Sequence, residues 1–173
     1  MRTFRLLVLV LPFLAGARVH PQEISFEYQV KAVYLFNFVK FVEWPSRADP
    51  GPLTICVAGR NPFGDVLQET LRGEEVNARP VTARVIREPE SGCHVLFVPH
   101  GAATSEYLRA ARGSATLTVG ESPGFIRQGG IINFILEEGK VRFEIDPKAA
   151  ERANLRISSH LLRLARTADQ KQP

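Results

Sequence analysis

Leu53-Thr54-Ile55-Cys56-Val57-Ala58 is the stretch that decides the fold of this 173-residue chain. It is almost continuously apolar, is rich in β-branched residues, and follows the turn-forming residues 49–52, Asp-Pro-Gly-Pro. A short strand of this kind is covered on both faces, as in a parallel sheet packed between helices. We therefore expect an α/β fold built around this strand.

Segments with strand and helix patterns alternate on either side of residues 53–58. The patterns predict helices over residues 26–42, 61–71 and 105–112, strands over 80–86, 93–98 and 115–119, and a hairpin of 131–136 with 140–145 around Gly139. Capping residues before proline or an apolar run, at Asn61, Asp146 and Ser158 or Ser159, predict helix starts. This order predicts a three-layer α/β sandwich with a mainly parallel sheet and a C-terminal antiparallel hairpin.

The N-terminus has the three parts of a secretion signal. Arg2 and Arg5 precede an apolar run that ends in Ala15-Gly16-Ala17. A membrane anchor is the alternative, but a helix needs about 20 apolar residues to span a bilayer, and this run is roughly half that length. We expect residues 1–17 to be a cleavable signal peptide and residues 18–173 to form a single α/β domain. No cysteine follows the small residues, so a lipid-anchored form is not expected.

The charge of the mature chain is nearly balanced. Cleavage removes two of the 22 basic residues and leaves 20 against 18 acidic ones, so the formal net charge falls from +4 to +2. No cluster of lysines and arginines remains to follow a phosphate backbone, so nucleic acid is not an expected partner. No later apolar run is long enough to span a membrane, and we expect a soluble exported protein.

Cys56 and Cys93 are the two cysteines of the chain. In an oxidising compartment such a pair is first interpreted as a disulfide, with a metal site or a reactive thiol as alternatives. The closed loop would run from residue 56 to residue 93, and the chain-entropy description gives it a stabilisation of about 4 kcal/mol.

The helix predicted over residues 26–42 is apolar around most of its circumference. One interpretation is a helix at the centre of the core. The other is that one face packs on this domain and a second face packs on another chain, a membrane partner or a second copy. Under the second interpretation the contact residues are Tyr34, Leu35, Phe38, Phe41 and Trp44.

Motifs of catalysis are missing from the sequence. Gly59 and Gly64 have P-loop spacing, but Asp65 and Val66 stand where Lys and Ser or Thr are needed. The string G-x-S-x-G of α/β hydrolases does not occur. The histidines have no second metal ligand at a suitable spacing, so we expect no metal site and no cofactor. A candidate loop for a small polar ligand, at the carboxyl ends of the strands, consists of Asn61, Phe63, Gly64 and Ser122.

Several segments together resemble the YfiR family of bacterial periplasmic proteins. They are residues 30–38 (VKAVYLFNF) with 41–45 (FVEWP), 56–59 with 62–64, 93–97 (CHVLF), 129–134 (GGIINF) with 141–145, and 149–150 with 155–162. The resemblance covers nearly all of the mature chain in the family's order. It implies a periplasmic α/β regulator, often a homodimer, that binds and represses the sensor domain of an inner-membrane diguanylate cyclase. Some members have a second cysteine pair, and this chain has one pair only, so redox control by another disulfide is not implied.

Two hypotheses of function follow. The first is a non-enzymatic periplasmic regulator of an inner-membrane signalling protein, a diguanylate cyclase, that controls cyclic-di-GMP and biofilm formation. The alternative is a periplasmic module that binds a small ligand and acts with a histidine kinase or an outer-membrane receptor.

Overall fold

A computed structural model describes residues 25–45 and 51–166. The predicted signal peptide and the C-terminal tail lie outside the described residues. A seven-stranded sheet has the order β3-β4-β2-β5-β6-β7-β8 and is parallel except at its two edges, where β3 pairs with β4 and β7 pairs with β8. The strands are β2 (Leu53–Ala58), β3 (Glu75–Val76), β4 (Arg79–Ile86), β5 (Val95–Val98), β6 (Leu117–Gly120), β7 (Ile132–Glu137) and β8 (Lys140–Ile145).

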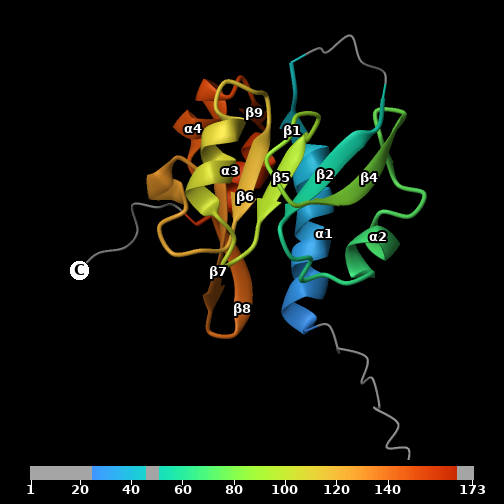
Figure 1. Cartoon of the computed structure of the whole chain (residues 1–173), viewed down its shortest axis with the longest axis horizontal. Coiled ribbons are helices and arrows are strands. Elements are labelled where there is room, and N and C mark those ends of the chain that lie inside the picture. The colour runs from blue at the N-terminus through green and yellow to red at the C-terminus, as the bar shows by residue number, and fades with distance from the viewer. Residues whose placement is uncertain (1–24, 46–50, 167–173) are drawn as a thin grey trace, which may run out of the picture.

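Helices cover both faces of this sheet (Figure 1). The helices are α1 (Phe26–Phe41), α2 (Val66–Thr70), α3 (Thr104–Ala111), α4 (Pro147–Arg152) and α5 (Ser159–Leu164), with one 3₁₀ turn at Ile126–Gln128. Successive side chains of β2 alternate between the two faces: Ile55 and Val57 belong to the core under α1, whereas Cys56 and Ala58 belong to the core under α3. The predicted three-layer α/β architecture, the mainly parallel sheet and the C-terminal hairpin are confirmed.

The predicted Cys56–Cys93 disulfide is present in the smaller of these two cores. It joins β2 to the segment just before β5, with 5.7 Å between the Cα atoms. Both cysteines are buried, next to Tyr107 and Leu108 of α3. The bond therefore ties two neighbouring central strands on the face that α3 covers.

One local prediction was inaccurate, and one small sheet was missed. The helix expected from Asn61 begins only at Val66, because Asn61 is used in a turn: its Oδ1 accepts from the backbone N–H of Phe63 (2.9 Å) and its Nδ2 donates to the carbonyl of Gly64 (2.8 Å). A two-stranded sheet of β1 (Val42–Glu43) with β9 (Arg156–Ile157) was not predicted. Strands of two residues have no periodicity that a sequence pattern could reveal.

Helix caps near the C-terminus are confirmed. Asp146 Oδ1 accepts from the N–H of Ala149 (3.1 Å) at the start of α4, and Ser158 Oγ accepts from the N–H of Leu161 (3.2 Å) at the start of α5.

The segment after β6 is held down by Phe125, which is fully buried. Its ring lies very close to two glycines. A Cβ atom on Gly120 would lie 2.3 Å from the ring, and a Cβ atom on Gly130 would lie 2.1 Å from it. These two glycines therefore allow the loop of residues 121–130 to fold back tightly against the end of β6, which positions Glu121.

Candidate functional site

Leu35 and Phe38, two of the residues predicted at a contact with another chain, are 0% exposed. Phe38 packs between the rings of Phe134 (5.7 Å) and Phe143 (5.2 Å) of the β7–β8 hairpin. Neither side chain presents surface to a partner, so their assignment to an interface was wrong. The apolar periodicity that suggested an interface instead reflects packing of α1 on its own sheet.

The other three predicted contact residues, Tyr34, Phe41 and Trp44, are partly exposed. The Tyr34 ring lies 5.3 Å from that of Phe143, and the Phe41 ring lies 5.1 Å from that of His160. Trp44 donates its indole N–H to the carbonyl of His94 at 3.3 Å. Each therefore has one side in the core, and their contact with another chain stays a prediction.

The outward face of α1 carries three apolar residues beside the exposed polar residues Gln29 and Lys40. Phe26 is 77% exposed and Val33 is 50% exposed, and Phe36 is partly exposed with Lys40 Nζ 5.2 Å from its ring centre. Val33 follows Phe26 by seven residues and Phe36 follows Val33 by three, a spacing that places them along one stripe of the helix. A solvent-facing helix stripe is normally polar, so this one is suited to contact with another protein. We call Phe26, Val33 and Phe36 the α1 outer stripe.

The predicted ligand loop is largely engaged within the chain. Phe63 is fully buried, with its ring centre 5.4 Å from that of Tyr28 and 5.0 Å from that of Phe97. Asn61 and Gly64 form the turn described above, and the Ser122 carbonyl accepts from the N–H of Phe125. Ligand binding by Asn61, Phe63, Gly64 and Ser122 stays a prediction.

A cleft of about 940 Å³ lies close to that loop, beyond the carboxyl ends of β5 and β6. The N-terminal end of α1 and the β7–β8 hairpin, which project at the same end of the molecule in Figure 1, form its sides. Its charged and polar lining residues are Glu27, Tyr28, Lys31, His100, Glu121, Arg127, Asn133, Glu137, Glu144 and Arg166. We call it the polar cleft.

Lys31 and Glu121 form a buried ion pair on one wall of the polar cleft. Their side chains are 4% and 5% exposed, and Lys31 Nζ lies 2.6 Å from Glu121 Oε2. Lys31 also pairs with Glu27, one helical turn earlier. Glu121 Oε1 accepts from the Tyr28 hydroxyl (3.0 Å) and from the backbone N–H of His100 (2.8 Å). The network thus joins α1 to the loops that follow β5 and β6.

Burial of the Tyr28 hydroxyl raises the pKa of this tyrosine well above its ordinary value of 10, and the adjacent Glu121 carboxylate raises it further. Tyr28 is therefore a hydrogen-bond donor at neutral pH. With Lys31 paired to two carboxylates and Tyr28 protonated, this wall holds the sheet and helix together and supplies no free acid or base.

Sequence reasoning missed the Lys31–Glu121 pair. A signal was present: Lys31 is a charged residue in the middle of an apolar helix, four residues after Glu27, and Glu121 directly follows the apolar run that forms β6. A lone charge in such a helix is expected to find a buried partner. The sequence does not say which of the 18 acidic residues the partner is.

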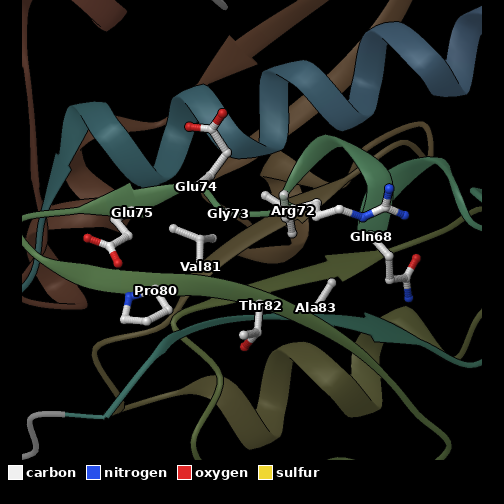
Figure 2. Close-up of a pocket in the computed structure, with 10 residues that line it drawn as sticks. Gln68, Arg72, Gly73, Glu74, Glu75, Pro80, Val81, Thr82 and Ala83 are labelled. Atoms are coloured by element: carbon white, nitrogen blue, oxygen red, sulfur yellow. The ribbon is translucent and has the colours of Figure 1, made fainter.

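A second hollow, of about 420 Å³, lies between the end of α2 and strands β3 and β4. Figure 2 shows Gln68 and Arg72 at one end of it and Glu75 at the other, with Pro80 and Val81 between them. Its polar groups do not converge on one point, so the arrangement suggests no chemical step.

The described residues contain no group of three or more His, Cys, Asp or Glu side chains suited to a metal ion. In the same residues, no helix is both long enough and apolar enough to cross a membrane. An α/β domain with apolar residues on an outer helix face and a polar cleft has surfaces of the kind that binding proteins use.

The comparison with protein families agrees with this class. The model of the family described as YfiR/HmsC-like matches residues 28–166. The chain belongs to the YfiR/HmsC-like family, as its motifs suggested. This family consists of periplasmic regulatory proteins that act generally in cyclic-di-GMP signalling.

Proposed function

We propose that this chain is exported through a cleavable signal peptide and restrains an inner-membrane signalling protein by binding its periplasmic sensor domain. The partner is a diguanylate cyclase, and the consequence of binding is a lower level of cyclic-di-GMP and less biofilm. The protein carries out no reaction itself. Membership of the YfiR/HmsC-like family supports the proposal.

The observation that carries the proposal is the α1 outer stripe. The other side of α1 already supplies the chain's own core, through Leu35 and Phe38. Phe26 and Val33 lie outside that core, whereas Phe36 packs against it with part of its ring. Contact with a second protein would explain the surface that these three side chains leave exposed. Aromatic and aliphatic side chains of this kind dominate the binding energy of protein interfaces.

A matched pair of substitutions tests the proposal. Val33→Asp places a charge on the α1 outer stripe, where Val33 is 50% exposed. Val85→Asp does the same on strand β4, where Val85 is 45% exposed, and serves as the control. Because both side chains are half exposed, both variants are expected to fold.

The assay is binding of the purified mature protein to the periplasmic sensor domain of a membrane diguanylate cyclase from the same bacterium. We expect Val33→Asp to weaken binding at least about tenfold and Val85→Asp to leave it unchanged. Equal affinity of the two variants would contradict the role of the stripe, and absence of binding by the wild type would contradict the choice of partner.

Homodimer formation is part of the proposal and is measured on the same variants by light scattering after gel filtration. A dimer that dissociates with Val33→Asp and persists with Val85→Asp uses the α1 outer stripe. A wild-type protein that is monomeric at all concentrations contradicts the dimer.

A further inference from the structure

We propose that Asn133 and Glu144, on the wall of the polar cleft formed by the β7–β8 hairpin, bind an organic ammonium group. This inference does not depend on the proposed partner, because it rests on hydrogen bonds and charges inside the cleft.

Asn133 and Glu144 are paired across the hairpin. Asn133 of β7 lies opposite Glu144 of β8, so their side chains are on the same face, and Asn133 Nδ2 donates to Glu144 Oε1 at 3.2 Å. An ionised carboxylate only accepts hydrogen bonds, which fixes the amide with its nitrogen toward Glu144. The amide oxygen is therefore the atom that needs a donor from elsewhere.

That oxygen, Asn133 Oδ1, has no hydrogen-bond partner within residues 25–45 and 51–166. Asn133 is 3% exposed, so bulk water does not replace the missing donor. A buried acceptor without a donor is rare in folded proteins and is destabilising. The oxygen is itself buried, so a ligand N–H reaches it when the Asn133 side chain turns toward the cleft that it lines, and such a ligand removes the defect.

Four carboxylates line the polar cleft against three cations, Lys31, Arg127 and Arg166, so the cleft has an excess of one negative charge. Glu27 and Glu121 are paired with Lys31, and Glu137 is paired with Arg166 at 2.5 Å. Among the residues that the structure describes, no ion pair includes Glu144, whose one hydrogen bond is to a neutral amide. A ligand here should therefore carry a positive charge.

An ammonium group fits both requirements. It has three N–H donors and a single charge, so it can donate to Asn133 Oδ1 and to Glu144 together. A hard metal cation would need six or more oxygen ligands, and the two side chains offer too few. Apolar lining from Ile135 and Leu136 suits an alkyl chain attached to the ammonium group. The source is either a free amine or a lysine side chain of another protein.

The probe is 1,4-diaminobutane, titrated into the purified mature protein by calorimetry, with 1,4-butanediol as the uncharged analogue. We expect the diamine to bind and the diol not to bind. Glu144→Gln should weaken diamine binding at least about tenfold, the loss of one charge-assisted hydrogen bond. Glu138→Gln, in the exposed hairpin turn, should leave binding unchanged.

Asn133→Leu removes the unpaired acceptor and should weaken diamine binding while keeping or raising the melting temperature. If that variant does not fold, Glu144→Gln alone decides. Nα-acetyl-lysine N-methylamide separates the two sources, since tighter binding than the diamine indicates a protein side chain and weaker binding indicates a free amine. No heat of binding for either cation, equal binding of the diol, or an unchanged affinity in a folded Glu144→Gln variant overturns the proposal.

Discussion

Replacement of Lys31 by methionine is the most informative single change in this structure. Methionine fills a similar volume, so the change removes the charge and leaves little cavity. The Glu121 carboxylate, 5% exposed, would then remain buried without its cation. Removal of one partner of a buried ion pair destabilises a protein by about 3–5 kcal/mol.

We expect the lower end of that range, about 3 kcal/mol, because Glu121 keeps its hydrogen bonds from Tyr28 and His100. For a domain of this size the melting temperature should fall by roughly 6–12 °C. The double variant Lys31→Met/Glu121→Gln should recover at least half of the loss, since an amide needs no cation. Lys40→Met changes an exposed lysine of the same helix and should cost less than about 0.5 kcal/mol.

The assay is urea denaturation of the mature protein at pH 7, followed by far-ultraviolet circular dichroism. The reasoning is refuted if Lys31→Met is as stable as Lys40→Met. It is also refuted if the stability lost by the double variant equals the sum of the losses of Lys31→Met and Glu121→Gln measured separately. Either result would mean that Glu121 reaches water in solution.

Three further predictions concern stability. Cys56→Ala/Cys93→Ala should lower the free energy of unfolding by about 4 kcal/mol, measured by urea denaturation, and an equal stability of the reduced and oxidised wild type would contradict this. Gly130→Ala should lower the free energy of unfolding by about 1–3 kcal/mol, because its Cβ would lie 2.1 Å from the Phe125 ring. Adding Phe125→Leu to the same chain should return part of that loss. A Gly130→Ala variant as stable as the wild type would show that the loop shifts to make room for the methyl group. The pKa of Tyr28 is raised in the folded state, so the folded protein holds the tyrosine proton more tightly, and stability should fall as the pH rises above 10, the ordinary tyrosine value. In thermal melts between pH 9 and 11, the stability of Tyr28→Phe should fall less steeply than that of the wild type. An identical pH profile of the two proteins would count against the burial of this hydroxyl.

The sequence predicted the elements whose pattern depends on local chemistry. The buried strand over residues 53–58 has the predicted bounds, and the caps at Asp146 and Ser158 bind the backbone N–H groups that such residues normally bind. The disulfide was predicted from a pair of cysteines in a chain expected to be exported.

Predictions failed where the partner of a residue is far away along the chain. Phe38 looked like an interface residue because nothing in the sequence says that the rings of Phe134 and Phe143, far along the chain, pack against it, and Leu35 is buried in the same core. Asn61 is a different case, because its partners Phe63 and Gly64 are local: its side chain closes a turn before the helix instead of capping it. The Lys31–Glu121 pair and the Asn133–Glu144 pair depend on the order of the strands, which sequence periodicity does not encode.

The central claim, restraint of a membrane diguanylate cyclase, is tested most directly by the cellular level of cyclic-di-GMP in the bacterium that encodes this chain. Deletion of the gene should raise that level, wild type and Val85→Asp should restore it when expressed to equal amounts, and Val33→Asp should leave it high. An unchanged level after deletion would contradict the claim, and full restoration by Val33→Asp would contradict the role of the α1 outer stripe.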